Sequence, residues 1–207
     1  MTSTPHVILV PGYWLGAWAW DDVAPNLRHA GLYPHAVTLP GLESADADRS
    51  SITLDDHVAG VRDLVDRLDG DVVLVGHSGG APVVQMVADQ RPERVRRVIY
   101  VDQGPALDGV SSFADLPADP VDVGFPNDEY LAANNLSVDG LDAEVLAGLR
   151  QRAVRQPSGV MRQPVRVSDA RRFAVPVTVL CTSLPSAVLR QLIAGGQLPT
   201  ELADYDD

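Results

Sequence analysis

Five short, strongly apolar runs recur along the chain at intervals too long for hairpins, and this spacing constrains the fold more than any other feature of the sequence. Runs that are almost continuous in Val, Ile and Leu favour strands covered on both faces, as in a parallel sheet. Helix-length segments separate them. Strands that alternate with helices predict an α/β fold with a mostly parallel, doubly wound sheet. The expected strands are 6–10, 33–39, 71–76, 95–102 and 175–181, and the expected helices are 20–30, 54–68, 80–90, 141–154 and 185–196.

Residues 103–172 interrupt this alternation. They are rich in Pro, Gly, Asp and Asn and hold only one expected helix. Long irregular segments inside a compact fold are usually functional, so we predict a lid or cap insert; a helical insert that only shields the sheet is the alternative. The predicted organisation is an N-terminal part of the core in 1–102, the lid or cap in 103–172, and an incomplete C-terminal part of the core in 173–207.

The charge balance bears on the partners of the protein. All 16 basic residues are arginines, and the 28 acidic residues give a formal net charge of −12, which repels phosphate backbones and anionic lipid. No apolar run is long enough to cross a membrane, the N-terminus does not resemble a secretory signal, and Cys181 is the only cysteine. We expect a cytoplasmic protein with a small-molecule substrate, no nucleic-acid or membrane partner, no metal and no cofactor.

The sharpest chemical signal is the sequence Gly76-His77-Ser78-Gly79-Gly80, directly after an expected strand and before an expected helix. A nucleophile on a sharp strand-to-helix turn needs small residues two positions before and after it, because the backbone doubles back there. The N-terminus of the following helix would direct N–H groups and partial positive charge at a developing oxyanion. We interpret Ser78 as a nucleophile; an ordinary Gly-rich turn with Ser78 as a helix cap is the alternative.

This motif and the segments around it resemble the α/β-hydrolase superfamily, in particular its short esterase and hydroxynitrile-lyase-like branch. The resemblance covers nearly the whole length, in the segments 7–32, 36–45, 75–81 and 95–106. It implies the α/β-hydrolase fold and a serine hydrolase that cleaves small carboxylic esters through an acyl-enzyme on Ser78. Hydroxynitrile-lyase-type C–C cleavage and a non-catalytic binding protein of the same fold are the alternative functions.

The resemblance also implies an oxyanion donor in the turn after the first strand. The family usually has His-Gly there, whereas this chain has Pro11-Gly12-Tyr13. Because the donor is a main-chain group, Pro in place of His need not remove it. We predict that the N–H groups of Tyr13 and Gly79 form the oxyanion hole. Three tryptophans follow closely and line an acyl pocket or belong to the core; they are Trp14, Trp18 and Trp20.

The acid of the catalytic site is expected after a different strand from the usual one. The family often places it after the strand 175–181, but Thr182 and Ser183 stand there in this chain. A variation in the superfamily places the acid after the preceding strand, where this chain has Asp102. We predict that Asp102 orients a histidine base; an aspartate that caps the following loop is the alternative.

A histidine base is missing from the place that the family implies, a loop after a final strand. No histidine follows His77 in the sequence. His77 itself is expected to point away from Ser78, because neighbouring residues of an extended strand face opposite sides. His57 shares a helix face with apolar residues and is interpreted as a packing residue.

The strand 175–181 adds an argument from packing. It is apolar, and without a further strand it would form an unguarded sheet edge. We therefore expect that the sequence lacks a C-terminal segment with the last strand and the histidine loop. A naturally inactive protein is one alternative, and a strand exchanged between two copies, which would give a homodimer, is another.

Overall fold

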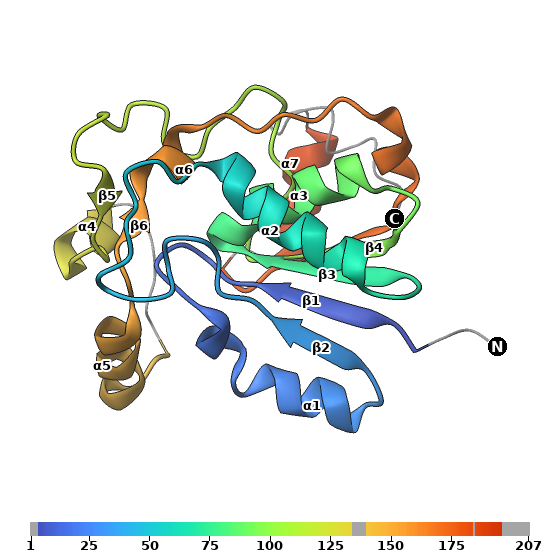
Figure 1. Ribbon diagram of the computed structural model, residues 1–207, viewed down its shortest axis with the longest axis horizontal. Helices are drawn as coiled ribbons and strands as arrows, with labels where there is room; N and C mark the ends of the chain where they lie inside the picture. Colours follow the sequence, from blue (N-terminus) through green and yellow to red (C-terminus); the bar gives the residue numbers. More distant parts are fainter. Residues whose placement is uncertain (1–3, 134–139, 184, 196–207) are drawn as a thin grey trace.

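A five-stranded sheet forms the centre of the computed structural model, which describes residues 4–133, 140–183 and 185–195 (Figure 1). The strand order is β2-β1-β3-β4-β7, and every neighbouring pair is parallel. This order confirms the predicted doubly wound α/β sheet. Each strand falls on one of the five apolar runs: β1 (His6–Val10), β2 (Tyr33–Ala36), β3 (Val72–His77), β4 (Val95–Val101) and β7 (Val177–Leu180).

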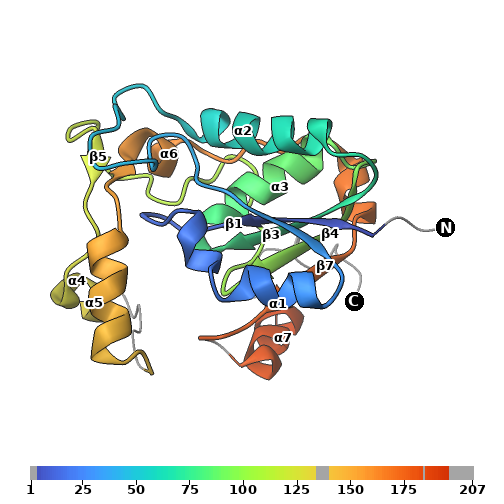
Figure 2. The same ribbon diagram turned by 60° about the horizontal axis from the view of Figure 1, so that its bottom comes forward.

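Helices lie on both faces of this sheet (Figure 2). The helices α2 (Leu54–Arg67) and α3 (Ala81–Gln90) cover one face, and α1 (Val23–His29) and α7 (Ser186–Ala194) lie on the other. Because side chains alternate along a strand, Ile8 of β1 joins the core beneath α2 and α3, whereas Leu9 joins the core beside α1. The continuous apolar sequence of β1 thus reflects burial on both faces.

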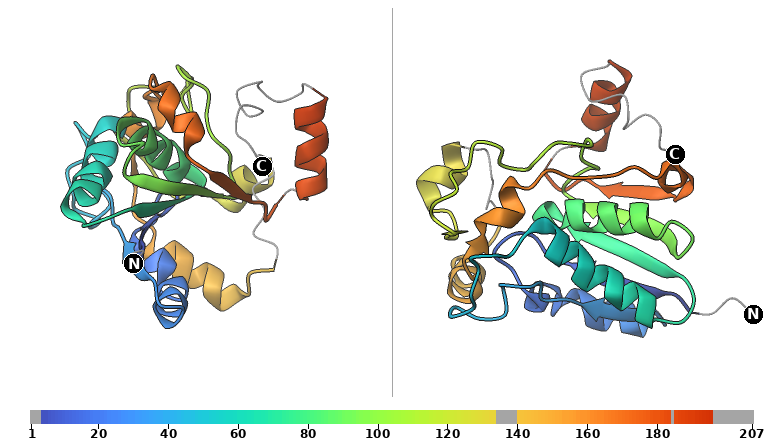
Figure 3. Two further views of the ribbon diagram at one scale, coloured as in Figure 1. Left: turned by 90° about the vertical axis from the view of Figure 1, so that its right-hand side faces the viewer. Right: turned by 45° about the horizontal axis from the view of Figure 1, so that its top comes forward.

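The two lateral edges of the sheet, at β2 and at β7, differ in how they are covered. The predicted helix 20–30 divides into a 3-10 turn, η1 (Ala17–Trp20), and α1, which packs beside β1 and β2. At the β7 edge, α7 stands apart from the sheet (Figure 3, left), and none of its residues is buried. Within the described ranges, no helix is both long and apolar enough to cross a membrane.

The cap elements of the segment 103–172 lie beyond the carboxyl ends of the strands, and the arrowheads of β1 and β2 point toward them in Figure 1. The predicted helix 141–154 corresponds to α5, whereas the other elements were not predicted. Residues 134–139 and 196–207, with the last position of the expected helix 185–196, lie outside the described residues. The cap elements are β5 (Asp122–Val123), α4 (Asp128–Ala133), α5 (Ala143–Arg152), β6 (Gln156–Pro157) and α6 (Ser158–Arg162), and a 3-10 turn, η3 (Ala170–Ala174), leads toward β7.

Candidate active site

Ser78 lies in the turn between β3 and α3. It opens a 3-10 turn, η2 (Ser78–Gly80), that leads directly into α3. Its backbone φ is 46°, in the left-handed region that residues other than glycine seldom adopt. Such strain persists only where the surrounding packing enforces it, and it is typical of functional turns. The sharp strand-to-helix turn predicted from the sequence is therefore present, with Ser78 as its first residue.

Two glycines allow this turn to pack tightly. A Cβ atom on Gly76 would lie 2.6 Å from Cγ2 of Val84 in α3. A Cβ atom on Gly80 would lie 2.6 Å from the carbonyl oxygen of Pro11, in the loop after β1. Protein interiors are close-packed, so neither position accepts a side chain unless its surroundings move. The small residues around Ser78 thus bring β3, α3 and the loop after β1 together.

Tyr13 and Gly79, the predicted oxyanion pair, are in contact. A Cβ atom on Gly79 would lie 2.5 Å from Cγ and Cδ1 of Tyr13, so the ring lies against the backbone of Gly79. A Cβ atom on Gly12 would lie 3.3 Å from Cβ of Ser78, which places the loop after β1 beside the serine as well. Within the described residues, the backbone N–H of Tyr13 donates no hydrogen bond to another group of the protein, so it is available to a ligand. The structure thus brings both predicted donor residues together beside Ser78.

The cap residue Gln156 fixes the loop after β1, and sequence reasoning did not identify it. The Trp14 amide donates to Oε1 of Gln156 at 3.0 Å, and the Val154 amide donates to the Trp14 carbonyl oxygen at 2.9 Å. Gln156 is fully buried, so water does not compete for its hydrogen bond. The cap thereby holds the peptide that follows Tyr13. No local pattern signals this contact, because the two residues lie 142 positions apart.

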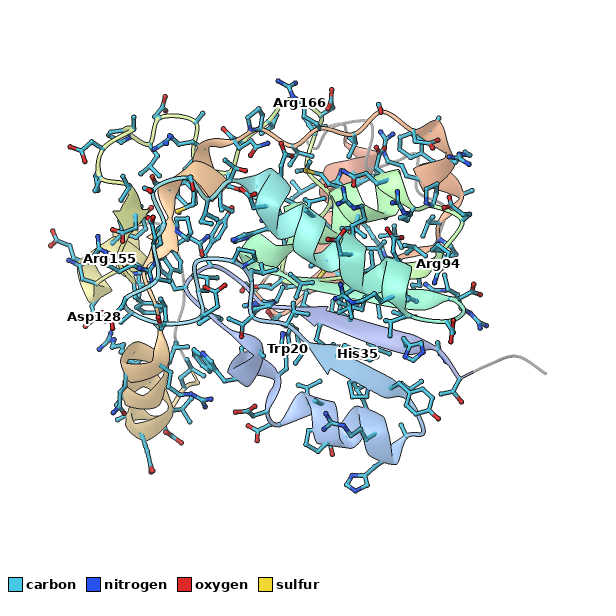
Figure 4. The ribbon with its side chains drawn as sticks, in the orientation of Figure 1. Trp20, His35, Arg94, Asp128, Arg155 and Arg166 are labelled. Atoms are coloured by element: carbon cyan, nitrogen blue, oxygen red, sulfur yellow. The ribbon has the colours of Figure 1, made fainter. Side chains whose placement is uncertain are left out.

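The three tryptophans, for which a pocket or a core role was open, make structural contacts. Trp20, labelled in Figure 4, is buried in the core beside α1. The indole Nε1 of Trp14 donates to the carbonyl oxygen of Val123 at 3.0 Å. The guanidinium of Arg152 lies 4.4 Å from the ring centroid of Trp18. Trp14 and Trp18 therefore join the loop after β1 to the cap.

Asp102 directly follows β4, the neighbour of β3, and Ser78 directly follows β3. The register pairs His77 of β3 with Val101 of β4, so Ser78 and Asp102 are the next residues on adjacent parallel strands. Asp102 also has a positive φ, 52°. Since adjacent strands lie about 5 Å apart, both residues leave the sheet at the same point of its edge.

Residues after β7 surround the Asp102 carboxylate. Its Oδ1 accepts from the amides of Thr182 and Ser183, at 3.1 and 2.7 Å, and its Oδ2 accepts from the Ser183 hydroxyl. Burial alone would raise the pKa of Asp102, but the hydrogen bonds from Ser183 and Thr182 hold it below its usual value. Asp102 is thus a fixed anion near neutral pH. Thr182 and Ser183 stand where the usual acid was missing from the sequence, yet their role as donors was not predicted.

No hydrogen bond joins Ser78 to any of the five histidines, all of which lie in the described residues. His77 packs edge-on against Trp20, with ring centroids 6.5 Å apart, and its Nδ1 would lie 3.0 Å from a Cβ atom on Gly12. Burial lowers the pKa of His77, and the charge of Asp102 opposes that effect. His57 is buried and its Nε2–H donates to the carbonyl oxygen of Pro40, which confirms the expected packing role.

The remaining histidines lie away from the cap. His6 of β1 and His35 of the edge strand β2 share a hydrogen bond of 2.9 Å, and His29 ends α1. Figure 4 shows His35 on β2, away from Asp128 and Arg155 at the cap end. Among the described residues, no group of three or more His, Cys, Asp or Glu side chains is placed to hold a metal ion.

The chain belongs to the Alpha/beta hydrolase family, whose model matches residues 7–205. It is 36% identical over 115 residues to a carbendazim hydrolyzing esterase of Nocardioides sp., a match that covers 54% of this chain and 47% of the relative. It is 30% identical over 107 residues to salicylic acid-binding protein 2 of Nicotiana tabacum, covering 49% of this chain and 40% of the relative. The chain thus spans about half the length, or less, of the curated relatives it matches. These relatives support the esterase branch of the predicted resemblance.

Solved structures support the same fold. A methylesterase from Arabidopsis superposes with a TM-score of 0.73 at 19% identity, covering 91% of this chain and 85% of that structure. An extracellular alpha/beta-hydrolase from a Paenibacillus species superposes with a TM-score of 0.70 at 22% identity, covering 87% of this chain and 80% of that structure. At these identities the likeness establishes the α/β-hydrolase fold.

Proposed function

We propose that this protein is a serine hydrolase that cleaves small carboxylic esters through an acyl-enzyme on Ser78. The observation that carries the proposal is the strained Ser78 backbone on a tight strand-to-helix turn, with Tyr13 and Gly79 packed beside it. Main-chain donors held by such packing are preorganised for an oxyanion. Asp102, next along the sheet edge and anionic at neutral pH, is the group we assign to orient the base.

The reaction would proceed in two halves. The Ser78 oxygen attacks the ester carbonyl carbon, its proton passes to a base, and the Tyr13 and Gly79 amides donate to the carbonyl oxygen as it becomes negative. The tetrahedral species collapses, the base returns the proton to the leaving alcohol, and the acyl group stays on Ser78. A water molecule then attacks the acyl-enzyme by the same route and releases the carboxylic acid.

The base is the one role that the five histidines of the printed sequence do not fill. No hydrogen bond joins any of them to Ser78, so we assign the base to a histidine from outside the printed sequence that faces Ser78 and Asp102. The absence of a histidine hydrogen-bonded to Ser78 also favours a second candidate function. This is a non-catalytic protein of the same fold that holds an apolar ligand under the cap. The two functions differ in whether Ser78 is nucleophilic.

The substrate class follows from charge and from the relatives. The formal net charge of −12 disfavours strongly anionic substrates, so we assign neutral or apolar esters. The relatives named as a carbendazim hydrolyzing esterase and as methylesterases support an ester substrate. Hydrolysis of the ester needs no cofactor in this mechanism, because water is the only co-reactant.

Covalent labelling tests the proposal directly. The protein expressed from its complete reading frame is treated with a fluorophosphonate probe, and the modified peptide is identified by mass spectrometry. We expect phosphonylation at Ser78, none in Ser78→Ala, and unchanged labelling in the control Ser51→Ala, an exposed serine in the loop before α2. Absence of labelling at Ser78 in the folded protein would refute the hydrolase and favour the binding protein.

A further inference from the structure

The Tyr13 side chain occupies the space that a side chain at position 79 would need. The three ring atoms nearest to a Cβ atom on Gly79 would lie only 2.5 to 2.6 Å from it. No Cβ atom tolerates such distances, so a residue larger than glycine at position 79 and this position of the Tyr13 ring exclude one another. The two residues that supply the predicted oxyanion donors are thus also a sterically matched pair.

The ring is held from the cap side. The Tyr13 hydroxyl donates to Oγ of Ser112 at 2.7 Å. Trp14 packs edge-on against the ring at 5.8 Å between centroids, and Phe113 packs at 6.1 Å with a tilt of 57°. Burial raises the pKa of Tyr13, and the hydrogen bond with Ser112 opposes that effect. The side chain is therefore neutral at physiological pH and acts as a fixed apolar wall.

We propose that the Tyr13 ring, seated on Gly79 and tied to Ser112, limits the size of the acyl group that this site accepts. The inference rests on the proposed function: a carbonyl oxygen held by the amides of residues 13 and 79 places the acyl carbon beside both residues. At position 79 no side chain is present, and Tyr13 fills the room beside it. Short acyl groups pass the ring, whereas longer ones collide with it.

A double-mutant cycle tests the steric pair without any assay of activity. Gly79→Ala should lower the melting temperature by roughly 5 °C, because the new methyl group displaces the ring. The same substitution in a Tyr13→Ala background should lower it much less, since the ring is gone. Additive shifts in the two backgrounds would overturn the steric pairing and the inference with it. The matched control is Gly148→Ala in α5, where no heavy atom outside the surrounding helix backbone lies within 4 Å of the added Cβ.

The acyl-chain preference tests the functional part. The ratio of kcat/KM for p-nitrophenyl hexanoate to that for the acetate is measured with the protein expressed from its complete reading frame. A ratio does not depend on the absolute rate, so slow turnover does not obscure it. Tyr13→Ala should raise this ratio about tenfold or more, because the ring no longer excludes the longer chain. Tyr13→Phe, which keeps the ring, should leave the ratio near that of the wild type.

Two further variants make the outcome decisive. Tyr13→Leu serves where Tyr13→Ala fails to fold, and it should raise the ratio by a smaller factor. Tyr33→Ala removes an exposed tyrosine at the sheet edge and should leave the ratio unchanged. An active protein whose ratio is the same in the wild type, Tyr13→Ala and Tyr13→Leu overturns this inference alone. A folded protein that neither hydrolyses esters nor labels at Ser78 overturns the proposed function, and this inference with it.

Discussion

Trp14, Ser78 and Asp102 are the three non-glycine residues with a positive φ in the described part of the chain, and each follows a strand of the central sheet. They come after β1, β3 and β4, which are neighbours in the sheet. A non-glycine residue in this conformation costs about 1 kcal/mol or more, so surrounding contacts must hold it there. Gln156 holds Trp14, and Ser183 holds Asp102. Strain is therefore concentrated at the edge where we place the reaction.

His57 shows how a single buried residue sets a pH dependence. Burial is the main cause that lowers the pKa of His57 to about 4, partly offset by its hydrogen bond to Pro40. The unfolded chain binds a proton at His57 below about pH 6.5, whereas the folded protein does so only near pH 4. Stability is therefore lost as the pH falls through this window.

The His57 contribution is measurable by urea unfolding. Between about pH 7.5 and about pH 5 we expect it to lower the free energy of unfolding by about 2 kcal/mol. His57→Gln should show a pH dependence that is smaller by this amount, and His29→Gln, at the exposed end of α1, should behave as the wild type. An equal pH dependence in all three proteins would contradict the assignment.

At the scale of elements, a buried arginine joins the cap to the loop after β2. The Arg49 guanidinium donates to the carbonyl oxygens of Ser44, Ala45 and Ala47, and its Nε donates to the carbonyl oxygen of Arg155 at 2.8 Å. The Arg49 side chain is only 4% exposed. The guanidinium presents five N–H donors along one planar fork, whereas a lysine ammonium presents three donors at a single point and cannot reach the same set of carbonyl groups. This side chain therefore helps to hold the cap against the loop after β2.

Arg49→Lys should accordingly be costly although it keeps the charge. We expect the free energy of unfolding to fall by about 3 kcal/mol, because buried carbonyl groups lose their donors. Arg62→Lys, in an exposed pair with Asp63 on α2, should change it by less than about 1 kcal/mol. Urea denaturation of both variants checks the difference, and equal midpoints would show that the Arg49 network does not stabilise the cap.

At the scale of the whole molecule, the parallel sheet brings the ends of β1, β3 and β4 to one edge, with the cap beyond it. Every predicted site residue lies at this edge, while no described histidine has a hydrogen bond to Ser78. The described residues therefore place Ser78, Tyr13, Gly79 and Asp102, to which we assign the nucleophile, the oxyanion donors and the acid, at one edge of the sheet. In the proposed mechanism, no described residue is assigned as the base that accepts the Ser78 proton.

A protein expressed as residues 1–207 alone should consequently be a poor esterase. We expect kcat for p-nitrophenyl acetate at least about 1,000-fold below that of an efficient serine hydrolase, because loss of one triad member removes most of the rate. The assay uses a mass-verified chain, with Ser78→Ala to define the background. Full turnover by the 207-residue chain would mean that one of its own histidines reaches Ser78.

The amino-acid sequence by itself determined the parallel sheet, the helices on both faces and the Ser78 turn. Each of these depends on local patterns: continuous apolar runs, helical spacing and glycines at fixed distances from a serine. Only the tertiary structure decided that Gln156 holds Trp14, that Ser183 holds Asp102 and that the Tyr13 ring rests on Gly79. These contacts join residues far apart along the chain, and periodicity carries no information about which loops meet at a sheet edge.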